Sequence, residues 1–559
     1  MVPCDAAGQI FTAVPLPKAL ELPPSWLLVM EDQLSQHARR RFGLTYLYPY
    51  QRLVITSILE SAIDCRKAAE DPPPAGQIVV LPTGAGKSLC FQLPQTLLGG
   101  YTLVVYPLLG LMNDQERRIR AAGFSVAQLR GGQDRRTRFT VFQGLRTGAL
   151  DFLLTNPETL AGSAVRRALR PMPPARAVID EAHCVSEWGD SFRGAYLTLG
   201  ESLTAIGVDL RVAFTATASD HVITRIREVV FGGREVRLVR GDPDRPNISY
   251  SVVPSLSVPH SLRSLVVRPK DSPAEETPSV WHPGCVLPRP AVVFCRTRAQ
   301  TEAVARLLTP LLPPQSALYY HAGLAREQKL AVEEQFFHHP AAILAATCAY
   351  GMGVDKADIR SVVHTYLPAT AEAFLQESGR AGRDRAPALS VVLLSPREQI
   401  KHRRAVEQGT TNPVQAMAFG NQCRREQLLH HFGVEEHGCG GCDVCDRRGR
   451  GDLESWRSNA AAALVIAVAS ERKRLSRADW VALLRGRPSY RLHRSGATHN
   501  PVAGRFADWT AEELRIAFDD LCELGLLIKR RDGLSLPRKV EEDKTDPLLP
   551  FRFPRTMLD

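Results

Sequence analysis

The segment QIVVLPTGAGKSLC (77–90) sets the architecture of this chain, because an apolar run, a glycine-rich turn and a helix-compatible stretch follow one another directly. Glycines let the backbone wrap phosphate oxygens at a helix N-terminus, the following lysine supplies positive charge, and the serine hydroxyl can bind Mg²⁺. The full phosphate-loop pattern has glycine where Leu81 stands, and the alternative, a glycine-rich turn with a chance lysine, fits the preceding strand poorly. The candidate nucleotide-binding residues are Thr83, Gly84, Gly86, Lys87 and Ser88, with Ser88 also a candidate magnesium ligand.

Similar apolar runs recur along the chain, each about strand length and followed by a stretch that can form a helix. The first series comprises QIVVLP (77–82), TLVVYP (102–107), FLLTNP (152–157), RAVIDE (176–181) and RVAFTA (211–216). The second comprises PAVVFC (290–295), SALYYH (316–321), AAILAAT (341–347), SVVHTY (361–366) and ALSVVLL (388–394). Apolar strands that alternate with helices predict two α/β lobes, each with a parallel sheet covered on both faces. The proline-rich stretch 267–290 is expected to be a linker or surface insertion, and DPPPAG (71–76) a loop.

Composition narrows the class of protein. With 559 residues, the chain has room for about three to five domains. The net charge of +11 suits either a nucleic-acid partner or a solvated basic surface. No run reaches the roughly 18 apolar residues of a membrane span, and the N-terminus lacks a basic start followed by an apolar run. A cytoplasmic protein without membrane contact is therefore expected.

The tetrapeptide DEAH (180–183) ends the predicted strand RAVI. Asp180 is suited to hold Mg²⁺ and Glu181 to polarise the attacking water, which is the division of labour that nucleotide hydrolysis needs. By itself DEAH could begin a helix on any surface. Its place after a phosphate loop and ahead of FTATA (214–218) favours the catalytic interpretation.

The segment QESGRAGRD (376–384) places two arginines, Arg380 and Arg383, three residues apart in the second lobe. Planar guanidinium groups suit the charge that develops on a γ-phosphate. A basic helix end is the alternative, but it would not need glycines at 379 and 382. The candidate catalytic residues are Lys87, Asp180, Glu181, Gln376, Arg380 and Arg383.

Four cysteines cluster with the spacing C-x15-C-x2-C-x2-C, at Cys423, Cys439, Cys442 and Cys445. Four thiolates close a tetrahedral Zn²⁺ site against water, so we expect a structural zinc rather than a catalytic one. A redox C-x-x-C pair is the rival interpretation, and His437 is a competing ligand nearby. The other eight cysteines are scattered singly, as buried small hydrophobes are in a reducing compartment.

The region from about Trp456 to Arg538 predicts three helices and a strand pair. The helices are SNAAAALVIAVASE (458–471), RADWVALLRG (477–486) and AEELRIAFDDLCELG (511–525), and the strands flank a turn at Asp532-Gly533. This order is typical of a winged helix, although a helical packing domain with a solvated basic face is also consistent with it. The candidates to face DNA phosphates are Arg485, Arg487, Arg491, Arg494, Lys529, Arg530 and Arg531.

Taken in order, these motifs resemble superfamily 2 helicases, and the closer match is to the RecQ family, from about Phe42 to Cys445. The matching segments are PTGAGKSLCFQLP (82–94), YPLLGLMNDQ (106–115), DEAHCVSEWGDSFRGAY (180–196), DRPNISY (244–250), YYHAGL (319–324), AYGMGVDKADIRSVVH (349–364) and FLQESGRAGRDR (374–385). The surroundings of the cysteines, CRREQLLHHFG and CGGCDVC, match the family's zinc module. The resemblance implies two RecA-like motor lobes, a helical zinc-binding module and a winged-helix domain. It also implies ATP-driven 3′→5′ movement on single-stranded DNA with duplex separation, in recombination and repair.

The same resemblance implies two nucleotide contacts outside the phosphate loop. Gln51 should read the adenine edge with its amide, and Asp355 should contact the ribose. The family usually has an aromatic residue at Leu44, arginine at Tyr48 and glycine at Tyr50, so a tyrosine is expected to offer a stacking face instead.

The segment SEWGDSFR (186–193) resembles the family's aromatic-rich loop, which senses single-stranded DNA. Its candidate DNA-binding residues are Trp188, Phe192 and Arg193, although ordinary core packing of the two aromatics is the alternative. Asp190 stands where the family has histidine, and Ser191 where it usually has aspartate.

The expected domains are an N-terminal segment (1–29), an ATP-binding lobe (30–243), a second lobe (244–400), a zinc module (401–452), a winged helix (453–540) and an irregular tail (541–559). Expected cofactors are ATP, Mg²⁺ and Zn²⁺, and expected partners are single-stranded and duplex DNA and a single-strand-binding protein. A monomer associated with the nucleoid is expected. A DNA-structure-binding protein with a vestigial motor and an RNA motor remain alternative functions.

Overall fold

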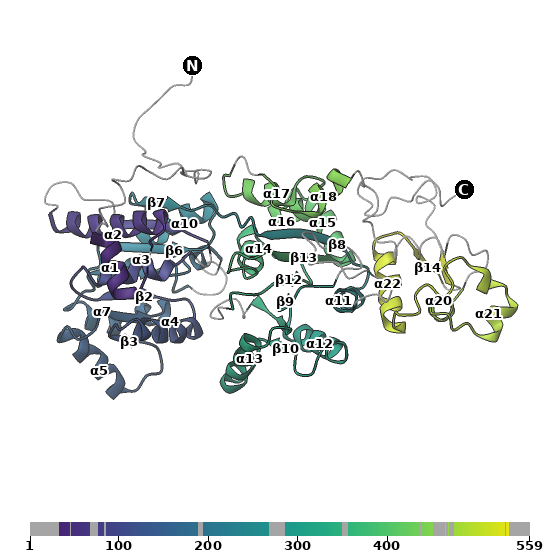
Figure 1. Cartoon of the computed structure of the whole chain (residues 1–559), viewed down its shortest axis with the longest axis horizontal. Coiled ribbons are helices and arrows are strands. Elements are labelled where there is room, and N and C mark those ends of the chain that lie inside the picture. Colours follow the sequence, from purple (N-terminus) through teal and green to yellow (C-terminus); the bar gives the residue numbers. More distant parts are fainter. Residues whose placement is uncertain are drawn as a thin grey trace, which may run out of the picture. The chain divides into compact units, whose positions relative to one another are not determined.

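The computed structural model describes residues 33–44, 46–67, 76–82, 85–187, 194–267, 286–348, 356–434, 438–450, 464, 468, 475–530 and 533–535. The chain divides into two compact units, Met1–Asp244 and Arg245–Asp559. Unit 1 runs from purple to blue in Figure 1, and unit 2 from teal to yellow.

Unit 1 is built on a seven-stranded parallel sheet with the strand order β3-β4-β2-β5-β6-β1-β7. The strands are β1 (Gly76–Val80), β2 (Thr102–Val105), β3 (Val126–Gln128), β4 (Phe152–Thr155), β5 (Arg176–Ile179), β6 (Arg211–Thr215) and β7 (Arg237–Arg240). The helices are α1 (Gln33–Phe42), α2 (Pro49–Lys67), α3 (Lys87–Gln95), α4 (Leu109–Ala121), α5 (Arg135–Arg146), α6 (Pro157–Ala161), α7 (Ser163–Leu169), α8 (Cys184–Glu187), α9 (Leu199–Ala205) and α10 (Asp220–Phe231). The five strands predicted from apolar runs are confirmed, and β3 and β7 are additional.

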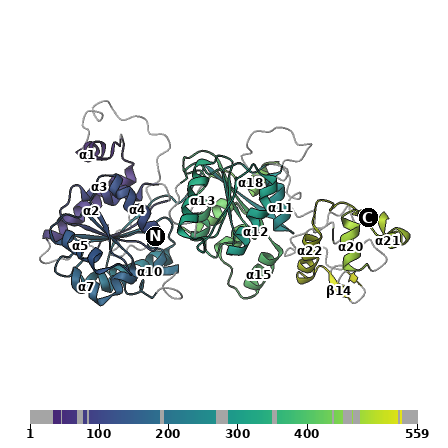
Figure 2. The same ribbon diagram turned by 90° about the horizontal axis from the view of Figure 1, so that it is seen from below.

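Alternate side chains of each central strand enter two different cores, as expected for a sheet covered on both faces. In β1, Ile78 and Val80 belong to one hydrophobic cluster, whereas Val79 belongs to the other. The first cluster packs under α5, α7, α9 and α10, and the second under α2, α3 and α4. Figure 2 shows α2, α3 and α4 on one side of this sheet and α7 and α10 on the other.

Unit 2 contains a six-stranded parallel sheet with the order β10-β11-β9-β12-β13-β8. Its strands are β8 (Ile248–Pro254), β9 (Ala291–Phe294), β10 (Ala317–Tyr320), β11 (Ile343–Ala346), β12 (Ser361–His364) and β13 (Ala388–Leu394). The helices of this lobe are α11 (Val258–Val266), α12 (Arg298–Leu308), α13 (Arg326–His338), α14 (Ala371–Ser378) and α15 (Pro396–Glu407). All five predicted strands are confirmed, and β8 is additional.

The zinc module comprises α16 (Pro413–Phe419), α17 (Arg424–His430) and α18 (Asp443–Arg450). Its side chains share one hydrophobic cluster with the lobe: Val414, Leu428 and Cys442 pack in the same core as Ile248 and Tyr250 of β8. The module is therefore part of the lobe's own core, because it covers the face of the sheet at the edge strand β8.

The C-terminal region contains α20 (Arg477–Leu484), α21 (Tyr490–Arg494), α22 (Ala511–Glu523) and the antiparallel pair β14 (Ile528–Arg530) and β15 (Gly533–Ser535). The two later predicted helices and the strand pair are present. Of the first predicted helix, 458–471, the structure describes only Leu464 and Val468. Asp532 lies outside the described residues. The predicted place of Gly533 in the turn is wrong, because Gly533 belongs to β15 and pairs with Arg530 of β14. The backbone of Gly533 also lies close to Leu475: a Cβ on Gly533 would be 2.4 Å from the Leu475 carbonyl oxygen.

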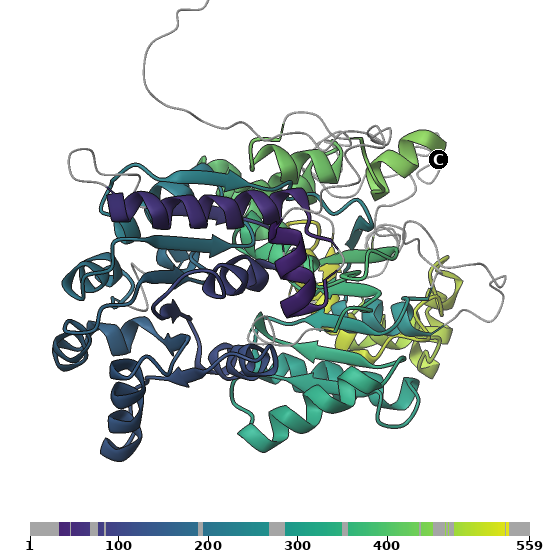
Figure 3. The same cartoon turned by 60° about the vertical axis from the view of Figure 1, so that its left-hand side comes forward.

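Within the described part of the chain, no helix has both the length and the apolar character needed to cross a membrane. The longest helix of unit 1, the 19-residue α2, is the long purple helix in Figure 3. It turns only part of its surface toward the core, through Val54, Ile55 and Ile58.

Candidate functional site

The phosphate loop lies between β1 and α3. Gly86 is the N-cap of α3 in the left-handed conformation (φ 79°), and Lys87 and Ser88 are the first residues of the helix. This geometry directs the helix's first N–H groups, and the positive end of its dipole, toward the loop. Thr83 and Gly84 lie outside the described residues.

Gln51 of α2 is buried against this loop. Its side-chain Nε2 donates to the carbonyl oxygen of Ala85 at 2.9 Å, and its Oε1 accepts from the backbone N–H of Tyr48 at 3.1 Å. A Cβ on Gly86 would lie 2.5 Å from Gln51 Nε2, so only glycine lets the amide approach so closely. The amide that the resemblance assigns to adenine is thus engaged with two backbone groups, and it supports the loop.

The rings beside Gln51 form an aromatic ladder. Tyr48 and Tyr50 stack with ring centroids 5.5 Å apart and planes 4° from parallel, and Tyr46 meets Tyr48 edge-on. Tyr46 is 61% and Tyr48 39% exposed, so two rings of the ladder reach solvent. Leu44 packs partly buried in the core beneath α2.

Asp180 follows β5, and Glu181 is the next residue, so both lie at the same edge of the sheet as Lys87. Strands β1 and β5 flank β6, and in a parallel sheet their carboxyl ends point the same way. Burial, together with the neighbouring charge of Glu181, raises the pKa of Asp180 to about 6, although the positive charge of Lys87 acts to lower it. Glu181 adopts a positive φ of 51°, and its N–H donates to Asp180 Oδ1 at 3.0 Å.

His183 links this acidic pair to the neighbouring strand. Its Nδ1 lies 3.5 Å from Glu181 Oε2 and 3.1 Å from Thr215 Oγ1, and the Thr215 hydroxyl donates to the carbonyl oxygen of Thr217. DEAH and FTATA are both recognisable in the sequence, but the sequence alone indicated no role for His183 or Thr215. The structure shows that the two motifs share one polar contact through a buried histidine.

The candidate arginines lie in the turn that follows α14. Arg380 is buried and Arg383 and Gln376 are half-buried. Just before them, the carboxylate of Glu377 is held by the Tyr366 hydroxyl at 3.1 Å and lies 3.1 Å from His364 Nε2. The arginines belong to unit 2, whereas the phosphate loop and Asp180 belong to unit 1. Asp355 lies outside the described residues.

The four predicted zinc ligands converge. The sulfurs of Cys423, Cys439, Cys442 and Cys445 all lie within 4.8 Å of one another, and those of Cys423 and Cys442 are 4.0 Å apart. A tetrahedral site with Zn–S bonds of about 2.3 Å requires sulfurs roughly 3.8 Å apart, so the arrangement fits Zn²⁺. Four sulfurs complete a tetrahedral set, which is typical of a structural zinc, and two of the ligands, Cys423 and Cys442, are buried. His437 lies outside the described residues.

A buried ion pair joins the two halves of this cluster. Arg424 follows Cys423 and Asp443 follows Cys442, and the guanidinium donates to the carboxylate through Nε at 3.0 Å and Nη2 at 3.3 Å. Arg424 Nη1 also donates to the carbonyl oxygens of Ala418 and Gly420. The pair holds the starts of α17 and α18 together, so the ligands are ordered by groups other than themselves.

Of the predicted DNA-binding groups, those on the C-terminal region are well placed to meet solvent. Among the described candidates, Arg485 is half-buried and the others are exposed: Arg487, Arg491, Arg494, Lys529 and Arg530. Tyr490 at the start of α21 is 77% exposed beside them. Helix α21 and its aromatic residue were missed from sequence. Trp188, Phe192, Arg193, Asp190, Ser191 and Arg531 lie outside the described residues.

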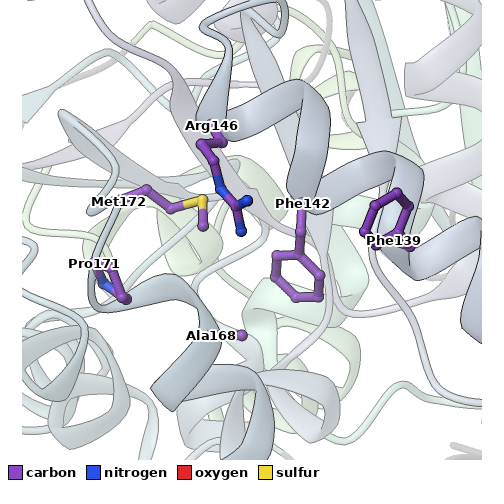
Figure 4. A pocket seen from close by; sticks show the side chains of 6 residues that line it. All are labelled: Phe139, Phe142, Arg146, Ala168, Pro171 and Met172. Atoms are coloured by element: carbon purple, nitrogen blue, oxygen red, sulfur yellow. The ribbon is translucent and has the colours of Figure 1, made fainter.

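A groove of about 560 Å³ opens on unit 1 between α5 and the end of α7. Figure 4 shows its lining by Phe139, Phe142, Arg146, Ala168, Pro171 and Met172. Helices α5 and α7 lead into the amino-terminal ends of β4 and β5, whereas Lys87 and Asp180 follow carboxyl ends. The groove is therefore not part of the nucleotide site.

Comparison with known proteins identifies relatives of both parallel-sheet lobes and of the cysteine-bearing module. Family models match residues 48–226 (DEAD/DEAH box helicase), 286–385 (helicase conserved C-terminal domain) and 384–446 (RecQ zinc-binding). The chain is 34% identical over 365 residues to the "Probable ATP-dependent DNA helicase RecS" of Bacillus subtilis, covering 65% of this chain and 67% of that protein. It is 31% identical over 400 residues to the ATP-dependent DNA helicase RecQ of Pasteurella multocida, covering 69% of this chain and 59% of the relative.

Other relatives are longer. The match to the RecQ-like DNA helicase blm-1 of Caenorhabditis elegans, at 33% identity, covers 66% of this chain but 38% of the worm protein. Among solved structures, the DEAD-box helicase Mss116 bound to single-stranded RNA and UDP-BeF is similar with a TM-score of 0.50 and 15% identity, covering 88% of this chain and 89% of that one. At that identity the likeness concerns the fold alone.

Proposed function

Because this chain belongs to the RecQ family of ATP-dependent DNA helicases, we propose that it hydrolyses ATP to move 3′→5′ along single-stranded DNA and separates duplex DNA, in recombination and repair. The observation that carries this proposal is the convergence of Lys87, Asp180 and Glu181 at one edge of the unit 1 sheet. Strands β5 and β1 flank β6 in a parallel sheet, so their carboxyl ends bring these groups to the same edge.

Each group has a distinct role in this proposal. Lys87 and the N-terminus of α3 bind the phosphates, Glu181 orients the attacking water, and His183 keeps the Glu181 side chain in place. Arg380 and Arg383 stabilise the charge that develops on the γ-phosphate, and Gln376 and Asp355 complete the nucleotide contacts. The Ser88 hydroxyl and Asp180 carboxylate are oxygen ligands of the kind Mg²⁺ prefers, and the metal would neutralise phosphate charge there.

DNA binding is assigned to two surfaces. Trp188, Phe192 and Arg193 bind the single strand and gate hydrolysis, and the C-terminal region binds duplex DNA as a winged helix. The exposed arginines and Tyr490 of α21 support the second assignment, because nucleic-acid surfaces combine cations with stacking faces. A monomer in the cytoplasm, associated with the nucleoid and contacting a single-strand-binding protein, completes the proposal.

Two assays test this function. ATPase activity should rise on addition of single-stranded DNA, and displacement should proceed from duplexes with a 3′ overhang. Unwinding from a 5′ overhang alone would contradict the polarity, and equal stimulation by RNA would favour an RNA motor.

A DNA-structure-binding protein with a weak motor is the second candidate, because the Gln51 amide is already engaged with backbone groups. Absence of any DNA-stimulated hydrolysis, together with retained DNA binding, would favour it.

The aromatic ladder carries a prediction about nucleotide selectivity. If the base stacks on Tyr48, Tyr48→Ala should raise the KM for ATP about tenfold, since base–aromatic stacking contributes roughly 1–3 kcal/mol. Because the Gln51 amide is engaged with backbone groups, wild-type KM values for ATP and GTP should also differ by less than about tenfold. Steady-state kinetics with both nucleotides measure this. Tyr46→Ala is the matched control, because that ring is more exposed. An unchanged KM in Tyr48→Ala would place the base elsewhere.

A further inference from the structure

The stretch Arg245–Asn247, which leads into β8, lies between the arginine-bearing turn and the zinc module. The turn, here called the arginine loop, is Gly379–Asp384. Strand β8 pairs with β13, the strand that follows the arginine loop in sequence. Residues more than 130 positions apart therefore meet at this edge of the sheet.

The side chains of this stretch grip the backbone of the arginine loop. Arg245 donates through Nη2 to the carbonyl oxygens of Gly382 at 2.6 Å and Ala381 at 3.2 Å, and through Nη1 to that of Gly379 at 3.3 Å. Asn247 Nδ2 donates to the carbonyl oxygens of Gly382 and Ala386, both at 2.9 Å. Five hydrogen bonds thus connect two side chains to carbonyl oxygens of the arginine loop and of Ala386 just beyond it.

The glycine at 382 makes this contact possible. It has a positive φ of 54°, and a Cβ at that position would lie 2.4 Å from Asn247 Nδ2. Its N–H donates to the carbonyl oxygen of Ile359 at 2.7 Å. Both polar groups of Gly382 are therefore used, and the loop conformation depends on close approach by Asn247.

The backbone of the same stretch is held from the other side by the zinc module. Arg425, which is 1% exposed, donates to the carbonyl oxygens of Arg245 at 3.1 Å and Ile248 at 2.6 Å. Tyr250 N donates to the carbonyl oxygen of Gly441 at 3.2 Å, within the cysteine-bearing segment. A Cβ on Gly440 would lie 2.6 Å from the carbonyl oxygen of Pro246. The zinc module therefore packs directly against the backbone of residues 245–250.

We propose that Arg245 and Asn247 are positioning residues for Arg380 and Arg383, and that the zinc module sets their place through Arg425. This rests on the proposed role of the two arginines. Groups that stabilise a transition state must be placed to within a fraction of an ångström, and a misplacement of 1 Å can cost about 100-fold in rate. Rigid support from a zinc-stabilised module supplies that accuracy to a turn that has no regular secondary structure of its own.

The decisive variant is Asn247→Ala, which removes two of the five bonds without a charge change. Its kcat for DNA-stimulated ATP hydrolysis should fall about tenfold while its KM for ATP stays within about twofold, because the loss concerns the transition state alone. In the background Arg380→Ala/Arg383→Ala, the same substitution should cost nothing further, because its effect acts through those side chains. Arg245→Lys, which keeps the charge but cannot fork to three carbonyls, should behave like Asn247→Ala.

Amide hydrogen exchange of a peptide spanning 379–386 provides a readout that does not need ATPase activity. Exchange should accelerate in Asn247→Ala and in Arg425→Met, whereas Asn500→Ala, a matched change of a buried asparagine in the C-terminal region, should leave it unchanged. Loss of kcat that adds fully to the double arginine variant, or unchanged exchange at 379–386, would overturn the proposal. A wild-type protein without ATPase activity would instead refute the proposed function, and the exchange result would still decide the positioning contact.

Discussion

Lys87→Ala is expected to lower kcat for DNA-stimulated ATP hydrolysis by about 10²–10³-fold, the range found when one preorganised charge-stabilising group is removed. Lys87 begins α3 beside the left-handed Gly86, so it stands at the helix N-terminus that would bind the phosphates. It also lowers the pKa of the buried Asp180. Without Lys87 that pKa should rise above about 6, so Asp180 stays protonated to higher pH and holds Mg²⁺ less well. Residual activity should therefore need a higher pH than the wild type.

Lys401→Ala is the matched control, because Lys401 is an exposed lysine on α15 paired with Glu398. Its kcat should stay within about twofold of the wild type, since Lys401 itself is exposed and Glu398 keeps a second cation, Arg296, at 2.9 Å. Thermal midpoints of both variants should match the wild type. A Lys87→Ala enzyme that keeps a tenth or more of its activity would mean that the phosphates are neutralised elsewhere.

Cys442→Ser is expected to abolish stoichiometric zinc and to destabilise unit 2. Cys442 is fully buried and belongs to the hydrophobic cluster that includes Ile248 and Tyr250 of β8. Structural zinc sites contribute about 10–16 kcal/mol in small peptides, which matches or exceeds the stability of a whole domain of about 5–15 kcal/mol. Even a partial loss of about 4 kcal/mol should lower the thermal midpoint by roughly 10 °C. Metal analysis and calorimetry measure the two effects.

The control for this change is Cys348→Ser, which replaces an exposed cysteine outside the cluster. It should retain zinc and leave the midpoint within about 2 °C, as surface substitutions usually do. Full zinc content with an unchanged midpoint in Cys442→Ser would show that three thiols suffice. Removal of zinc from the wild type by a chelator should reproduce the effect of Cys442→Ser without any substitution.

The elements predicted from sequence share a physical feature. Central strands such as β9 and β11 are buried on both faces, so their sequences, AVVF and ILAA, are continuous apolar runs. The strands that were missed lie at sheet edges: β3 has only three residues, β7 is half-buried with an arginine at each end, and β8 alternates serine with apolar residues. The serines Ser249 and Ser251 of β8 are nevertheless buried, on the face opposite to Ile248 and Tyr250, which the zinc module covers. Local sequence carries no sign of that cover.

The chemistry shows the same division. Four motifs could be predicted from sequence: the phosphate loop, DEAH, the two arginines and the four cysteines. In the first three, the reactive groups lie within a few residues of one another. The cysteines show the spacing that a tetrahedral metal site requires. What supports them could not be predicted. Gln51 meets Ala85, His183 meets Thr215, and Asn247 meets Gly382 only after the sheets form. The sequence by itself determined which chemical groups are present and their local order. Only the tertiary structure decided which distant side chains hold them, because a hydrogen bond depends on distance in space and not on separation along the chain.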